Sequence, residues 1–192
     1  MYAKVENNVI VKANSSLASF NRAAPSWSAE QLAANGIYEV VYDHSNLKDP
    51  RFYINGAENF DFANDTVTAS HGSATGKTLD DVNGTDENGV EYDPVVVISG
   101  VKSIEKNQIK TQAAGQLQST DWYVVRNAES STAIPANVST YRAAIRTKSN
   151  EMETAIDGAA TIEAVEALFT YINTGTEANP VHARPLGEWP KL

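Results

Sequence analysis

The sequence predicts an α+β fold in which a β-rich half, residues 1–100, precedes a helical region, residues 101–174. Before residue 100, β-branched and aromatic residues alternate with polar ones, and turn residues are frequent. After residue 100, apolar residues recur at spacings of three and four among Ala, Gln, Glu and Lys. The connections between the predicted strands are too short for crossover helices, so we expect the sheet to be antiparallel.

Short β-prone runs account for most of the first half. Two of them flank an Asn7-Asn8 turn and predict a hairpin. Another turn signal, Asn64-Asp65, separates two later runs. The predicted strands cover residues 2–5, 9–12, 37–42, 51–54, 59–62 and 65–69, with residues 95–98 as a further candidate.

One short helix interrupts these strands at residues 28–36. Ser28 can cap its first turn, and Gln31 stands three residues later, where a capping box requires Glu or Gln. Gly36 can end the helix because glycine adopts the left-handed conformation without strain.

Residues 71–93 are rich in Gly, Asn, Asp and Thr and predict a long exposed polar loop. Within this loop, Asp81, Asn83, Thr85 and Glu91 faintly resemble a calcium-binding loop, and the candidate metal ligands are Asp81, Asn83 and Asp86. An EF-hand counted from Asp81 requires Gly at its sixth position and Glu at its twelfth, where this sequence has Asp86 and Tyr92. We therefore expect no metal site, and these three residues are only weak candidates.

The second half predicts three helices and a tail. The first helix is expected to run without interruption over residues 101–126. Pro135 fits the first turn of the second helix, which should end near Gly158, and Thr161 can cap the third. The tail, residues 175–192, contains three prolines and is expected to be extended.

The first of these helices carries a narrow apolar stripe that includes several glutamines. Such a stripe suits a helix that packs on few neighbours or on copies of itself. Trp122 and Tyr141 would supply large anchors beside the following turn, where arginines can pair with carboxylates. The predicted interface residues are Ile104, Ile109, Leu117, Trp122, Val125, Tyr141, Arg142, Ile145 and Arg146.

Composition limits the partners. Fifteen Lys and Arg residues against 24 Asp and Glu residues give a net charge of -9, which disfavours binding to nucleic acid. The longest apolar run, residues 94–98, is too short to cross a bilayer. The N-terminus lacks the apolar stretch of a signal peptide, so we expect synthesis in the cytoplasm and no membrane partner.

Reactive side chains show no arrangement that predicts an enzyme. The chain has no cysteine, which excludes disulfides, thiolate metal sites and cysteine nucleophiles. His44, His71 and His182 lie far apart, and none has the partner four residues away that a helical zinc site requires. No Gly-x-Ser-x-Gly motif is present. We therefore expect neither catalysis nor a cofactor.

Three motifs follow one another between residues 119 and 168. They are Thr-Asp-Trp at residues 120–122, Ile-Pro at residues 134–135 and Tyr-Arg-Ala-Ala-Ile-Arg at residues 141–146. This segment resembles one found in tailed-bacteriophage proteins, namely tail fibre assembly chaperones, tail assembly chaperones and virion proteins. The opening residues 1–11 are similar to N-terminal hairpins of the same proteins.

The resemblance implies a structural component of a phage tail, baseplate or fibre that is made in the host cytoplasm and ends in the virion. Its partners would be other tail or fibre proteins, together with copies of itself. Two alternatives stay open. One is a tail fibre assembly chaperone that binds the fibre tip transiently. The other is an adhesin module that binds host-surface carbohydrate through loop 71–93.

Overall fold

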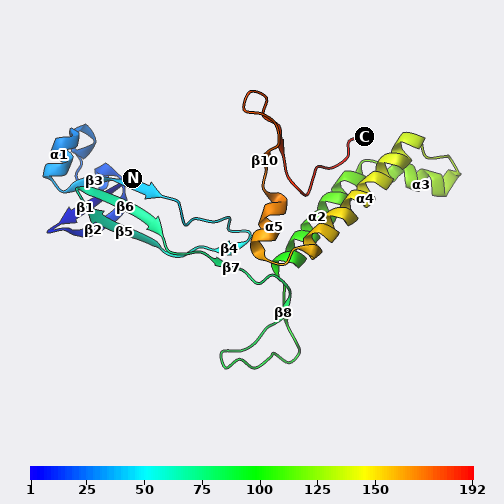
Figure 1. The fold of residues 1–192 in the computed structure, drawn as a ribbon, viewed down its shortest axis with the longest axis horizontal. Helices are drawn as coiled ribbons and strands as arrows, with labels where there is room; N and C mark the ends of the chain where they lie inside the picture. Colours follow the sequence, from blue (N-terminus) through cyan, green and yellow to red (C-terminus); the bar gives the residue numbers. More distant parts are fainter. The chain divides into compact units, whose positions relative to one another are not determined.

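A computed structural model describes residues 1–192, which form two compact units, Met1–Gly76 and Lys77–Leu192. The first unit holds a five-stranded sheet and the second holds four α-helices, which confirms the predicted α+β class (Figure 1). The division falls at residue 76, whereas the sequence predicts it near residue 100. Residues 77–100 belong to the helical unit because backbone hydrogen bonds tie them to the start of its first helix.

The sheet of the first unit has the strand order β2-β1-β3-β6-β5. Asn7 and Asn8, and likewise Asn64 and Asp65, have positive φ angles of 49–62°. Paired left-handed residues of this kind make the tight turns that match the twist of a hairpin, so both predicted turns are confirmed. The strands are β1 (Tyr2–Glu6), β2 (Val9–Ser15), β3 (Ile37–Asp43), β5 (Glu58–Ala63) and β6 (Thr66–His71).

The prediction of a wholly antiparallel sheet is wrong at one pair. β3 and β6 run parallel, with Val40 opposite Val67. The chain between them returns without a crossover helix, passing through the short strand β4 (Tyr53–Ile54), which pairs with β7 (Thr75–Gly76), and through β5. β5 then pairs along the outer edge of β6. The strand next to β3 in the sheet is therefore not the next strand in the chain.

Short helices close one end of this unit. α1 (Ala29–Ala34) has the predicted capping box, in which the Gln31 N–H donates to Ser28 Oγ at 3.3 Å and the Ser28 N–H donates to Gln31 Oε1 at 2.8 Å. Two 3-10 turns, η1 (Leu17–Ser19) and η2 (Ala24–Ser26), precede it. The sheet itself packs small and β-branched residues: Ala3, Val5, Val40, Val67 and Ala69.

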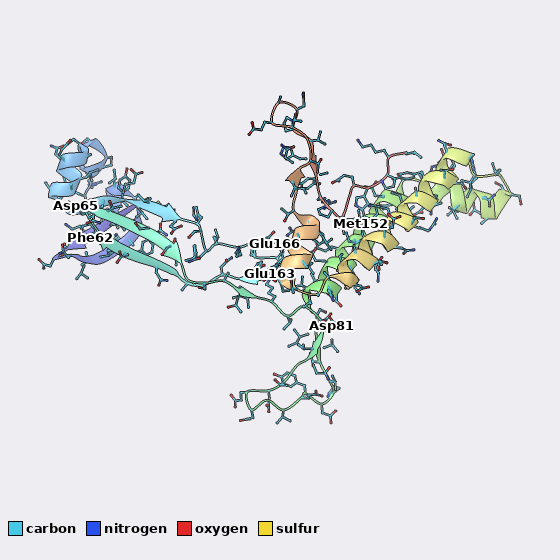
Figure 2. The ribbon with its side chains drawn as sticks, viewed as in Figure 1. Phe62, Asp65, Asp81, Met152, Glu163 and Glu166 are labelled. Atoms are coloured by element: carbon cyan, nitrogen blue, oxygen red, sulfur yellow. The ribbon has the colours of Figure 1, made fainter.

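The second unit is built on two long helices that lie side by side, α2 (Val101–Gln118) and α4 (Ala136–Gly158) (Figure 1). α5 (Ile162–Phe169) follows, and Thr161 caps it as predicted by accepting the Ala164 N–H at 3.2 Å. Figure 2 shows Met152 on α4, where it packs against α2. The buried residues of this core are Ile109, Ala113, Tyr141, Ile145, Met152, Ile156 and Leu186.

The tail is extended, as predicted, but part of it packs on the helices. β10 (Ile172–Asn173) and β11 (His182–Ala183) pair as an exposed hairpin in which each strand has two residues. After it, Leu186 is buried against Ile109 and Met152. Trp189 covers the same helix pair, and its ring N–H donates to Gln112 Oε1 at 3.0 Å.

The predicted helix over residues 101–126 is wrong as a single element, because it breaks at Ser119-Thr120. α3 (Asp121–Ser130) starts after the break as a separate helix. The Thr120 hydroxyl donates to the Leu117 carbonyl at 2.8 Å, and Arg142 on α4 donates to the same carbonyl at 3.0 Å. Arg142 also donates to Thr120 Oγ1 at 2.7 Å and pairs with Asp121 at 2.8 Å. These bonds satisfy groups that a helix end leaves without partners, so the chain turns there.

The break between α2 and α3, called the corner below, can be tested by replacing Arg142 with Met. The nearly buried guanidinium would be lost, which leaves Asp121 without its ion-pair partner and the Leu117 carbonyl with only its bonds to Thr120. We expect a loss of about 1.5–3 kcal/mol in the free energy of unfolding of the helical unit. Urea denaturation followed by far-UV circular dichroism measures it. Arg146→Met, one turn further along α4 at an exposed position, is the matched control, and an equal loss in both variants would contradict the role of the corner.

Candidate interaction surfaces

The predicted interface residues divide between the interior of the helical unit and its surface. The α2–α4 pair buries four of them and half-buries a fifth, so most of the narrow stripe is covered within the chain. The buried residues are Ile109, Tyr141, Arg142 and Ile145, Leu117 is half-buried, and the exposed residues are Ile104, Trp122, Val125 and Arg146.

Each buried candidate has a structural partner. The Tyr141 hydroxyl donates to the Gln116 side chain at 3.0 Å, and its ring packs beside Ile145. Arg142 holds the corner between α2 and α3. The motifs at residues 120–122 and 141–146 therefore meet in space through Arg142, and Ile134-Pro135 lies just before α4.

None of the ten residues of α3 is buried. Trp122 and Val125 are 51% and 53% exposed, and Val124 is exposed as well. The rings of Trp122 and Tyr123 lie 3.9 Å apart between centroids. The Arg126 guanidinium lies 4.7 Å from the centroid of Trp122, while its buried Nε has no hydrogen-bond partner. Residues 122–126 are called the α3 surface below.

Trp, Tyr and Arg are the residue types that contribute most at protein interfaces. A ten-residue helix is also marginal in water unless its apolar face packs against something. The α3 surface therefore has the composition of a protein interface and apolar side chains that the rest of the chain does not bury.

Residues 77–100 form a second exposed segment, called the ribbon below. Its strands, β8 (Val82–Asn83) and β9 (Val97–Ile98), are antiparallel, with Val82 opposite Ile98. A tight turn at the tip is held by Asp86, whose Oδ1 accepts the N–H groups of Asn88 and Val90, both at 2.9 Å. The predicted loop is exposed, and the candidate strand at residues 95–98 is confirmed at its last two positions.

The root of the ribbon is fastened to α2. The Gly100 N–H donates to Asp81 Oδ1 at 2.8 Å, and the Val101 N–H donates to the Thr78 carbonyl at 2.9 Å. Figure 2 shows Asp81 beside the start of α2. The Gly100 N–H, and after it the Ser103 side chain, hold the pKa of Asp81 below its ordinary value of 3.8.

The three weak calcium candidates have separate hydrogen bonds. Asp81 accepts the Gly100 N–H at the root of the ribbon, and Asp86 accepts the Asn88 N–H at its tip. The Asn83 amide donates to Glu91 at 3.1 Å. The structure brings no group of three or more His, Asp or Glu side chains into a metal-binding arrangement.

Sequence reasoning missed two features. The prediction of a strand at residues 95–98 gave no account of what covers its side chains, although four consecutive apolar residues are typical of a strand covered on both faces. The prediction of an extended tail also did not include its packing on the helices, although Trp189 is the type of large side chain that packs on an available apolar surface.

No family model, curated protein or solved structure matches the chain. None of its helices is both long and apolar enough to span a membrane.

Truncation of one buried and one exposed candidate separates core from surface. Ile145→Ala removes a fully buried side chain and should lower the free energy of unfolding of the helical unit by about 2–5 kcal/mol. Ile104→Ala makes the same change at a position that is 43% exposed and should stay within about 0.5 kcal/mol of the parent. Urea denaturation measures both, and an equal loss would show that Ile104 is not a surface residue.

The root of the ribbon should respond to acid. Because folding lowers the pKa of Asp81, its ionised form stabilises the root above pH 3.8, and this contribution is lost as the pH falls through the lowered value. The Gly100 amide signal in ¹H–¹⁵N spectra should therefore titrate below pH 3.8. Asp81→Asn should abolish that titration, and a midpoint at or above 3.8 would refute the bond.

Proposed function

We propose that this chain is a non-enzymatic structural component of a bacteriophage tail, baseplate or fibre. It stays in the virion and acts through contacts with copies of itself and with other tail or fibre proteins. The observation that carries the proposal is the α3 surface, in which exposed Trp122 and Val125 lie beside half-buried Tyr123 and Arg126 on a helix with no buried residue. The motif resemblance supplies the phage context.

The charge around α3 favours contact between copies. Asp121 is paired with Arg142, and Arg126 offsets Glu129, so the helix has little net charge although the whole chain carries -9. Two such surfaces can approach each other without strong repulsion, and a symmetric pair would bury Trp122 and Val125 on both copies.

The orientation of α3 also supports a role in contacts. The corner bonds from Arg142 fix the first turn of the helix against α4. At its other end, Ser131 adopts a left-handed conformation, and the Asn127 amide donates to the Thr132 carbonyl at 2.9 Å. Both ends are therefore held while the apolar side chains face solvent, as in a preorganised interface.

Self-association through α3 is testable with surface variants. Trp122→Ser combined with Val125→Ser should shift the protein from an oligomer to a monomer in sedimentation velocity. Its melting temperature at low concentration should stay near that of the parent, because both side chains are exposed. Val11→Ser combined with Val41→Ser, at positions of similar exposure in the first unit, is the matched control. A parent chain that is monomeric at every concentration would refute contact between copies.

A tail fibre assembly chaperone is the competing role, because an exposed tryptophan beside an arginine also suits transient binding of a client. Mass spectrometry of purified particles separates the two roles. A structural component should be present in stoichiometric amounts, whereas absence from the particle would refute the proposal and favour the chaperone.

A further inference from the structure

The ribbon exposes apolar side chains on both of its faces. Val97 and Ile98 are neighbours in β9, so they point to opposite faces. Val82 lies opposite Ile98 on β8 and shares its face. The large apolar residues of the ribbon, each 41–62% exposed, are Val82, Val90, Tyr92, Val95, Val96, Val97 and Ile98.

An apolar cluster of this density is unusual on a solvated loop and indicates a surface that another molecule covers. Because both faces are apolar, a flat partner would leave one face in water. A groove with two apolar walls would cover both.

The same segment is strongly acidic. Residues 77–100 contain six Asp and Glu residues against one lysine. Glu87, Glu91 and Asp93 lie towards the tip and close to the valines in sequence, and each is exposed. A groove that receives the ribbon would therefore need basic residues along its rim.

The ribbon is presented in a defined way. Asp81 holds the Gly100 N–H, and Lys102 pairs with Asp80 at 3.4 Å. A Cβ on Gly100 would lie 2.4 Å from the backbone of Asp80, so the two sides of the root approach as closely as a glycine allows. Anchoring of this kind lowers the entropy cost of docking.

We propose that the ribbon inserts into a groove of a different protein, one with apolar walls and a rim of lysine or arginine. A second copy of this chain is disfavoured because two ribbons would bring twelve acidic residues together. The inference goes beyond the proposed function, since that function depends on the α3 surface. Either can fail without the other.

The test uses the full chain and a synthetic probe. The probe is a peptide in which a flexible linker joins two cyclised β-hairpins, each with valines on one face and lysines along its edges, so that two apolar faces can enclose the ribbon. Fluorescence anisotropy of the labelled peptide measures binding, with a peptide in which glutamate replaces every lysine as the control. The parent chain should bind the lysine peptide, should bind it more weakly as salt is added, and should not bind the glutamate peptide.

Two sets of variants assign the binding to the ribbon. Val96→Ser with Ile98→Ser should weaken it at least about tenfold, because two apolar side chains lose their burial. Glu87→Gln, Glu91→Gln and Asp93→Asn together should weaken it and remove most of its salt dependence. Val9→Ser with Val11→Ser, exposed valines of the first unit, should bind like the parent.

Four results would overturn the proposal. They are no binding of the lysine peptide, equal binding of the glutamate peptide, self-association that Val96→Ser with Ile98→Ser abolishes, and binding of the parent to phosphatidylcholine vesicles that the same variant abolishes. The third result would assign the ribbon to a second copy and the fourth to a lipid surface. The α3 variants should bind the lysine peptide normally, which keeps this test separate from the proposed function.

Discussion

The arrangement of α2, α3 and α4 depends on the guanidinium of Arg142, which lies at the end of α2. Its guanidinium reaches the Leu117 carbonyl, the Thr120 hydroxyl and the Asp121 carboxylate, all within 3.0 Å. A nearly buried charge is tolerable only where oxygen atoms surround it, and here those atoms belong to the break between two helices. One side chain on α4 therefore ends α2 and starts α3. It also fixes the first turn of α3 against α4, and so helps to set the direction in which the apolar residues of α3 face.

That constraint also explains which apolar residues are left for partners. The facing apolar residues of α2 and α4 pack against each other, and the tail adds Leu186 and Trp189 to the same core. Most of the narrow stripe of α2 is thus covered within one chain, contrary to what its composition indicates in isolation, and Ile104 stays exposed. Trp122 and Val125 lie beyond the corner, where no other element covers them. The surface available to partners is set by where the helix breaks as much as by how apolar the chain is.

Features determined by nearby residues could be predicted from the sequence. The capping box of Ser28, the Asn64-Asp65 turn and the Thr161 cap each depend on groups within three residues of one another. The parallel pairing of β3 with β6 and the break at Thr120 depend on partners more than 20 residues away. No local pattern encodes those partners. The helical spacing of apolar residues extends past Thr120, so the sequence predicts one helix to residue 126. The Thr-Asp-Trp and Tyr-Arg motifs were visible, but their meeting through Arg142 was not.

The two exposed surfaces differ in the partner that their charge permits. α3 has paired charges around its aromatic residues, so a second copy can approach it at little electrostatic cost. The ribbon carries six acidic residues beside its valines, and an identical ribbon would repel it. Burial of the valines would be favourable with an identical ribbon or with a basic groove as the partner. Only the basic groove adds electrostatic attraction to the acidic residues. A chain with one neutral and one acidic surface can join copies of itself through the first and a different protein through the second. That division of contacts would suit the proposed role in an assembly.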